Sequence, residues 1–180
     1  MTACMQQVEK GKIKLDASVS EYLPEFASMK VADNYVMGNF GNMPNQLSPA
    51  HPAKTPIRIR DLMAMTAGLS YNTTSEPILE LKRKSGNKAS TREMVRAIAQ
   101  MPLLYEPGTR HAYSLGHDVI AAVVEVVTGQ KFRDYVLQYV FQPLGVDDVY
   151  FHLREEDKRR LADQYSCDFK TGKKSRHEGN

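Results

Sequence analysis

The chain has 180 residues, of which 42% are apolar and 25% charged, a composition typical of a globular domain with its own core. The net charge of +3 comes from dispersed basic residues, so no nucleic-acid partner is expected. No apolar run approaches the roughly 18 residues of a membrane-spanning helix, and the longest, 119–127, is interrupted by Glu125. The cysteines and histidines lack the spacing of a metal or redox site, and no glycine-rich phosphate loop is present, so neither a metal nor a cofactor is expected.

The opening segment predicts a helix. Apolar residues at Met1, Cys4, Met5 and Val8 have helical spacing, and Gly11 suits the position just after the helix end. The segment lacks the basic start and apolar stretch of a signal peptide, so it indicates no compartment. Because little sequence precedes this helix, we interpret it as the second half of a longer one.

The next part of the chain alternates short helices with loops. A helical turn is expected to stop at Pro24, and residues 28–56, rich in Asn, Gly and Pro, predict a long ordered loop. The stretch TPIRIRDLMAMTAGLS predicts a short helix that ends at Gly68. Residues 70–90 are polar and predict a loop with a weak helix at 76–84.

Two clear helices follow. Ser90 and Glu93 have the spacing of a capping box, and Pro102 is expected to end the helix that they start. Residues 116–128 are apolar nearly all round and are followed by Gly129, so this helix is expected at the centre of the core.

The remainder predicts an amphipathic helix over 131–145, a strand at VYFHL (149–153), a polar helix over 154–165 and an exposed or edge-paired tail. These elements favour one mainly α domain with at most one or two short strands.

Three stretches, in this order, resemble the serine β-lactamase and penicillin-binding-protein-like hydrolases. They are QQVEKGKIKLDASVSEYLPEF, TPIRIRDLMAMTAGLSY and PLLYEPGTRHAYSLGHDVIAAVVEVVTGQKFRDYVLQYVFQPLGVDDVYF, and they cover most of residues 5–151. That family includes class C β-lactamases, esterases and D-amino-acid peptidases, and its catalytic groups lie between an α/β lobe and a helical lobe. The resemblance implies that residues 1–180 form a single partial domain, mainly the helical lobe, without the sheet lobe.

The resemblance also implies a chemistry. The family uses a serine nucleophile and a lysine in S-x-x-K, a tyrosine in Tyr-x-Asn, and a third box, Lys-Thr-Gly or His-x-Gly. Tyr113-Ser114-Leu115 matches the second box, which makes Tyr113 the implied proton relay. Leu115 replaces the asparagine, which argues against a β-lactam substrate and favours an esterase or peptidase relative. The first box would align upstream of Met1 and the third beyond the last residue, so no nucleophile is expected in this chain.

Two short matches to these boxes are interpreted as chance. SGNK at 85–88 has the letters of S-x-x-K, but Gly86 and Asn87 favour a turn. KTG at 170–172 lies in a polar terminal segment without the apolar alternation of a buried strand, and we expect it to form the turn of a hairpin.

The other polar candidates have structural interpretations. His111 and His117, which flank the tyrosine, are interpreted as surface or capping residues, with catalysis as the weaker alternative. Glu125 is expected to reach the surface or to pair with an arginine, and Arg60 and Asp61 to form structural ion pairs.

Two functions stay open. The first is part of a serine hydrolase whose complete form would acylate its serine with a small-molecule ester, peptide amide or lactam and then hydrolyse the acyl-enzyme. Loss of a serine nucleophile costs on the order of 10⁶ in kcat, so the chain by itself is expected to be inactive. The alternative is a non-catalytic structural module that self-associates through apolar faces left partly uncovered on the first helix and on 116–128.

Overall fold

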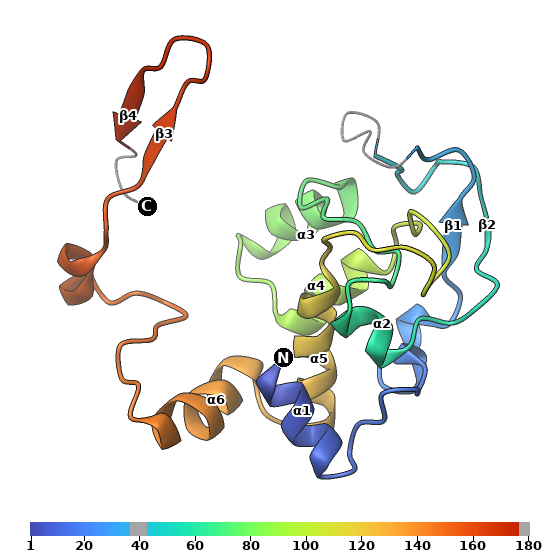
Figure 1. Cartoon of the computed structure of the whole chain (residues 1–180), viewed down its shortest axis with the longest axis horizontal. Coiled ribbons are helices and arrows are strands. Elements are labelled where there is room, and N and C mark those ends of the chain that lie inside the picture. Colours follow the sequence, from blue (N-terminus) through green and yellow to red (C-terminus); the bar gives the residue numbers. More distant parts are fainter. Residues whose placement is uncertain (37–42, 177–180) are drawn as a thin grey trace. The chain divides into compact units, whose positions relative to one another are not determined.

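The computed structural model describes residues 1–36 and 43–176, which form two compact units, Met1–Gly145 and Val146–Asn180 (Figure 1). Helices dominate the first unit, so the mainly α expectation is confirmed. Its helical segments are α1 (Thr2–Glu9), η1 (Val19–Glu21), η2 (Pro24–Phe26), α2 (Ile59–Met63), α3 (Glu76–Ser85), α4 (Thr91–Ile98), α5 (Gly116–Thr128), α6 (Phe132–Val136), η4 (Leu137–Phe141) and η5 (Gln142–Leu144).

The described residues hold little strand, in two short antiparallel pairs. β1 (Lys30–Ala32) pairs with β2 (Ala50–Pro52), inside the segment that was expected to be a loop. Val31 is bridged on its other side, in parallel, by Leu103. The backbone at residue 103 therefore lies beside β1 as a third, one-residue partner of this hairpin.

The second unit contains η6 (Glu155–Arg160) and a hairpin of β3 (Tyr165–Cys167) with β4 (Lys174–Arg176). The predicted strand at 149–153 is wrong, because these residues form no strand. Apolar residues there have no sheet neighbour in the described chain, and a strand forms only where a partner satisfies its backbone.

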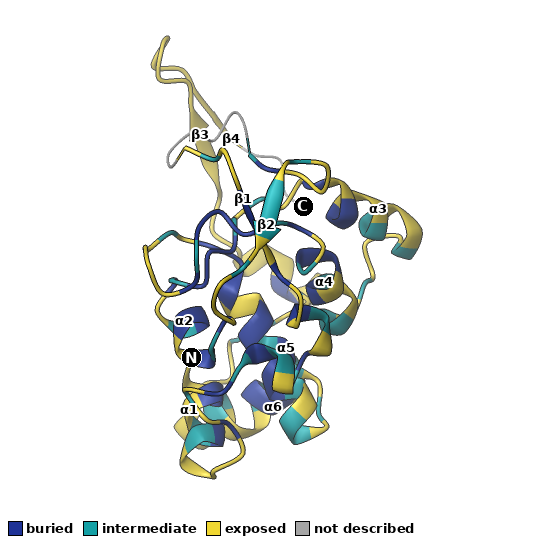
Figure 2. Ribbon diagram, turned by 90° about the vertical axis from the view of Figure 1, so that its right-hand side faces the viewer, coloured by how far each residue is buried: buried dark blue, intermediate teal, exposed yellow. Residues whose placement is uncertain are grey.

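Helix α5 is the centre of the first unit, as expected. Its apolar side chains at Val119, Ile120, Val123 and Val124 are buried, and α1, α2, α4 and α6 pack around it (Figure 2). Val126 is exposed near the end of the helix, so a small part of its apolar face is uncovered. Helices from both ends of the unit supply the cover that a local pattern does not reveal.

Helix α1 buries only part of the expected apolar set: Cys4 is buried and Val8 packs against the core. Ala3, Cys4 and Gln7 are buried, whereas Met1 and Met5 are 48% and 44% exposed. The Gln7 side-chain amide donates to the Tyr135 hydroxyl over 2.6 Å, so a polar group occupies the core-facing position with its hydrogen bond made.

The capping box of α4 is confirmed. The Ser90 hydroxyl accepts from the Glu93 N–H over 3.3 Å, and the Glu93 carboxylate accepts from the Ser90 N–H over 2.8 Å. The helix ends at Ile98, before Pro102 can act on it, since the Gln100 and Met101 N–H groups already bond in the tighter pattern of a helix end.

At Gly68 the backbone passes very close to the backbone of Tyr105. Its φ is +79°, and a Cβ there would lie 2.3 Å from the Tyr105 carbonyl oxygen. The Leu104 N–H donates to the Gly68 carbonyl over 2.7 Å, which brings residues 103–105 against the end of the 59–68 segment. Only glycine fits this position without moving the backbone.

We therefore predict that Gly68→Ala is more destabilising than Gly129→Ala. Both glycines have positive φ, but Gly129 has open space where its Cβ would lie. The difference isolates overpacking, which costs about 1–3 kcal/mol. Urea unfolding of both variants measures it, and equal losses would mean that Tyr105 moves aside at little cost.

Candidate functional site

The backbone around Tyr113 is fixed on both sides. The Ala112 N–H donates to the Met65 carbonyl over 3.0 Å, and the Leu115 N–H donates to the Ser70 carbonyl over 3.1 Å. The segment 112–115 therefore lies along 65–70, and the position of Tyr113 is set by hydrogen bonds rather than by its own side chain.

The side chains of this segment divide between surface and core. Tyr113 is 67% exposed, whereas Ser114 and Leu115 are buried. The Ser114 hydroxyl donates to the Met65 sulfur and accepts from the Gly116 N–H, both over 3.3 Å. Ser114 thus serves the turn into α5 and is not presented as a nucleophile.

Leu115 occupies the position where the resembled family has asparagine. It is the residue just before α5, and its side chain is 8% exposed. An apolar side chain suits this core-facing environment, whereas a buried amide would need hydrogen-bond partners. This burial agrees with the interpretation that Leu115 provides no polar contact to a substrate.

Tyr71 lies next to Tyr113, and sequence reasoning missed it. The two rings have centroids 4.8 Å apart and planes tilted by 55°. A pair of this kind contributes about 0.5–1.5 kcal/mol beyond its buried area. Tyr71 is itself 52% exposed, so the two rings form one aromatic surface. The only signal for it was its place at the end of TPIRIRDLMAMTAGLSY, which assigns no role by itself.

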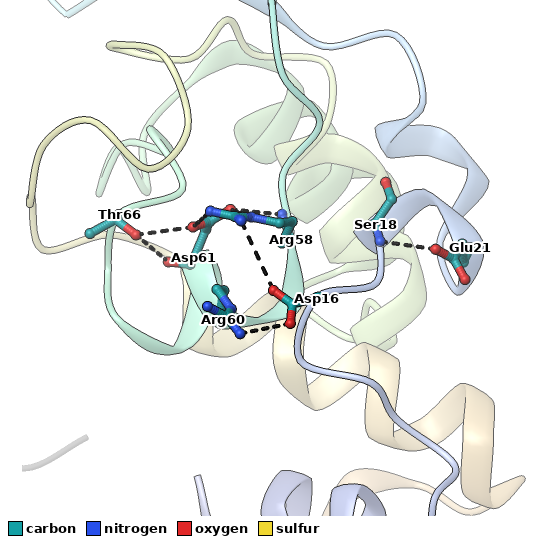
Figure 3. Close-up of polar contacts among 7 residues, drawn as sticks. All are labelled: Asp16, Ser18, Glu21, Arg58, Arg60, Asp61 and Thr66. Atoms are coloured by element: carbon teal, nitrogen blue, oxygen red, sulfur yellow. Dashed lines mark hydrogen bonds and ion pairs between the residues drawn. The ribbon is translucent and has the colours of Figure 1, made fainter.

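The carboxylate of Asp61, at the start of α2, is buried and only 4% exposed. Figure 3 shows its polar contacts. One of its oxygens accepts from the Arg58 backbone N–H over 2.9 Å and from Arg58 Nε over 3.1 Å. The other accepts from Arg58 Nη2 over 3.3 Å, and the Asp61 carbonyl accepts from the Thr66 N–H over 2.8 Å. One residue thus joins the first turn of α2 to the chain that leaves it.

The turn leading to Tyr113 rests on this pair. The Gly108 N–H donates to the Thr66 carbonyl over 2.8 Å. A Cβ on Gly108 would lie 3.5 Å from Arg58 Nη2 and 3.6 Å from Asp61 Oδ1, and its φ is +82°. These distances are ordinary van der Waals contacts, so it is the positive φ, rather than a lack of space, that favours glycine where the turn passes the Arg58–Asp61 pair.

Met65 carries the strained backbone of this region, with a φ of +57° at a residue other than glycine. Its carbonyl accepts from the Ala112 N–H and also, over 3.4 Å, from the hydroxyl of Tyr105. Burial raises the pKa of the Tyr105 hydroxyl, which keeps it a donor. Such strain persists where the surrounding contacts hold it, and it is frequent at functional sites.

The structural interpretation of Arg60 and Asp61 agrees with the observed ion pairs, which have different partners. Arg60 Nη2 donates to Asp16 Oδ2 over 2.7 Å, and Arg58 Nη1 is 4.0 Å from the other Asp16 oxygen. Asp16 is 69% exposed at its side chain, so these outer contacts lie in solvent (Figure 3).

Glu125 has partners other than the expected arginine. Its Oε1 accepts from the Thr91 hydroxyl over 3.0 Å and from the Phe132 N–H over 2.8 Å. The carboxylate therefore joins the first residues of α4 and α6, where helix N-termini favour a negative charge. His117 lies 3.5 Å from the Met63 carbonyl, and His111 is exposed.

The two chance motifs have the expected local structures. Ser85 is the last residue of α3, its hydroxyl donates to the Leu81 carbonyl over 2.8 Å, and Gly86 and Asn87 both have positive φ. Ser85 and Lys88 therefore do not share a helix face. Lys170 and Thr171 donate their N–H groups to Asp168 Oδ1 within the turn of the β3–β4 hairpin.

No group of three His, Cys, Asp or Glu side chains in the described residues is placed to hold a metal ion. No described helix combines the length and the apolar character needed to cross a membrane.

Comparisons with known proteins confirm the resemblance. A profile of the family described as Beta-lactamase matches residues 1–180. Lovastatin esterase from Penicillium rubens is 30% identical over 164 residues, which are 89% of this chain and 39% of that protein. EstCE1, a hydrolase with promiscuous acyltransferase activity, is 30% identical with a TM-score of 0.70 over 97% of this chain and 41% of its own. Simvastatin synthase LovD from Aspergillus terreus, 23% identical with a TM-score of 0.71 over 98% of this chain and 42% of its own, shares the fold.

The chain spans about 40% of the length of the curated relatives that it matches.

We predict that Asp61→Asn is strongly destabilising while Asp16→Asn is nearly neutral. The first change removes the charge from a buried acceptor, and hydrogen bonds to charged groups contribute about 1.5–3 kcal/mol. The second removes an exposed pair, which contributes about 0–1 kcal/mol. Urea unfolding of the two variants compares them, and equal effects would contradict a central role for Asp61.

Proposed function

The chain belongs to the β-lactamase family, and from that premise we propose that it supplies the helical part of a serine enzyme that transfers acyl groups, with Tyr113 as proton relay. The observation that carries the proposal is the arrangement of Tyr113. Its ring is exposed and paired with Tyr71, while the backbone on either side of it is hydrogen-bonded, at Ala112 to Met65 and at Leu115 to Ser70. A relay must be open to substrate and held in place, and this residue meets both requirements.

The proposed chemistry follows from what a phenol can do beside a serine and a lysine. The serine oxygen attacks the acyl carbonyl carbon, and its proton passes to the Tyr113 oxygen, whose own proton the lysine has accepted. The protonated Tyr113 then donates to the leaving oxygen or nitrogen as the acyl–enzyme forms. Water or an alcohol reverses these transfers when the acyl group leaves the serine.

The serine and lysine are proposed to lie outside these 180 residues. Ser114 is buried on Met65, and Ser85 ends its helix away from Lys88. Neither offers the geometry of a serine and lysine on one helix face, which S-x-x-K requires.

Among acyl donors, we propose an ester or peptide amide rather than a β-lactam. The buried Leu115 supports this choice, since it offers no amide to a lactam substrate. Two of the relatives, lovastatin esterase and EstCE1, a hydrolase with promiscuous acyltransferase activity, are in keeping with it.

The alternative function is a non-catalytic module that self-associates. It is supported by Met1 and Met5, which leave an apolar strip exposed on α1, but not by α5, whose apolar side chains are mostly buried. The two functions differ in a measurable way. If the chain self-associates, its sedimentation coefficient rises with protein concentration. If the acyl-transfer proposal holds, replacing Tyr113 lowers the turnover of the enzyme.

We predict that the 180-residue chain forms no adduct with a serine-reactive fluorophosphonate, because Ser85 ends its helix away from Lys88 and Ser114 is buried on Met65. Intact-mass spectrometry measures this, with folding checked on the same sample by circular dichroism. A stoichiometric adduct on folded protein would refute the placement of the nucleophile, and peptide mapping would identify the serine responsible.

In the longest in-frame product of the gene that encodes these residues, Tyr113→Phe is predicted to lower kcat for p-nitrophenyl ester hydrolysis by about 10²–10⁴, the usual contribution of a positioned acid or base. Tyr165→Phe is the matched control, because Tyr165 is similarly exposed but lies in the other unit. Unchanged turnover in Tyr113→Phe, or a product without S-x-x-K, would refute the proposed function.

A further inference from the structure

His51 lies between two carboxylates from different segments. Its Nδ1 is 2.6 Å from Asp33 Oδ1, and its Nε2 is 3.4 Å from Glu106 Oε1. His51 is the middle residue of β2, Asp33 directly follows β1, and Glu106 begins the turn that leads to Tyr113. One imidazole ring thus contacts both the hairpin and the segment that positions the proposed relay.

The backbone brings these three segments together without the imidazole. The Leu103 N–H donates to the Lys30 carbonyl over 2.7 Å, and the Ala32 N–H donates to the Leu103 carbonyl over 2.9 Å. Beyond β2, the Lys54 N–H donates to Glu106 Oε2 over 3.0 Å. His51 therefore adds a side-chain link at the edge of an existing backbone contact.

The other carboxylate oxygen of Glu106, Oε1, lacks a hydrogen-bond donor in the part of the chain that the structure describes. Glu106 Oε1 is buried and makes no hydrogen bond within the described residues, although the His51 ring is at ion-pair distance. A buried acceptor without a donor costs free energy. The ring nitrogen of His51 is the group placed to satisfy it.

The protonation state of His51 decides whether both contacts can be made. A neutral imidazole has one N–H and one acceptor nitrogen, whereas the imidazolium donates from both nitrogens. The charged groups that act on the ring in the described chain are the carboxylates of Asp33 and Glu106, and both favour the cation. With a neutral ring, one of the two carboxylates faces a nitrogen lone pair.

We propose that His51 is a pH-sensitive clamp, which in its protonated form holds the β1–β2 hairpin to Glu106 and releases that link when it loses its proton. The clamp stands on contacts within the chain alone. Only its consequence, a firmer placement of the turn before Tyr113 at acidic pH, rests on the proposed function.

The direction of the pH effect follows from linkage. The pKa of His51 is raised above its ordinary value of 6.5. The hydrogen bond to Asp33 is the largest cause, and the contact with Glu106 is a smaller one. A group whose pKa is raised on folding stabilises the fold fully below its unfolded pKa. The stabilisation is then lost as pH rises through the folded pKa, so the window begins near pH 6.5 and extends upward.

The test is a proton NMR titration of the His51 ring in the 180-residue chain, with Glu106→Gln and Asp33→Asn as variants. The midpoint of the His51 titration is expected above pH 6.5 in the wild type. Each variant is expected to lower this midpoint, because each removes one negatively charged carboxylate from beside the ring. His152, exposed in the second unit, is the internal control whose midpoint is expected to stay the same in all three proteins.

A second readout concerns the link itself. Amide exchange of Lys54, corrected for intrinsic rate, is expected to accelerate as pH rises from 6 to 8 in the wild type and to lose that dependence in His51→Gln. A wild-type midpoint at or below 6.5, or a midpoint that Glu106→Gln leaves unchanged, would overturn the clamp. If His51→Gln does not fold, the titrations of the wild type and of Asp33→Asn decide. A Tyr113→Phe enzyme with full activity would refute the relay but leave these measurements valid.

Discussion

The buried carboxylate of Asp61 is the constraint on which the candidate site depends. A charge that is 4% exposed persists only if hydrogen bonds replace its lost water, and Arg58 supplies three of them. Those bonds require α2 to begin at a fixed point, and the Asp61 carbonyl then fixes Thr66. Thr66 fixes Gly108, which begins the approach to Tyr113. A series of contacts thus leads from the Arg58–Asp61 ion pair through Thr66 and Gly108 toward Tyr113. Tyr113 is the exposed residue at the end of this series.

This arrangement accounts for strain beside the site. Met65 adopts a positive φ in the segment between Asp61 and Ser70. Its carbonyl is then free to accept from Ala112, and its sulfur from the Ser114 hydroxyl. The conformational cost at one residue is offset by contacts that hold the segment before α5 on both sides. Replacing that segment's polar contacts with solvent would leave the tyrosine on an unsupported loop.

Local sequence patterns predicted the elements whose cause is local. The capping box at Ser90 and the apolar run of 116–128 specify their helices because the relevant contacts lie within a turn or along one helix. Patterns failed where distant residues decide. The face that α1 buries depends on Tyr135, the partners of Glu125 come from two other helices, and a strand at 149–153 would need a neighbour. Tyr71 and His51 became visible only when the fold placed them beside Tyr113 and between two carboxylates.

The separation between the buried contacts that hold this segment and the exposed tyrosine, our proposed relay, has a physical basis. Acceleration by a positioned proton donor depends on holding it within a few tenths of an ångström of its working place, so the free energy that orders it must come from elsewhere. In this chain it comes from buried polar contacts around Asp61 and Met65 and from the packing of α5, none of which needs a substrate. Tyr113 can therefore be exposed without being loosely placed. His51 differs from these contacts, because the strength of its links to Asp33 and Glu106 depends on a proton rather than on packing.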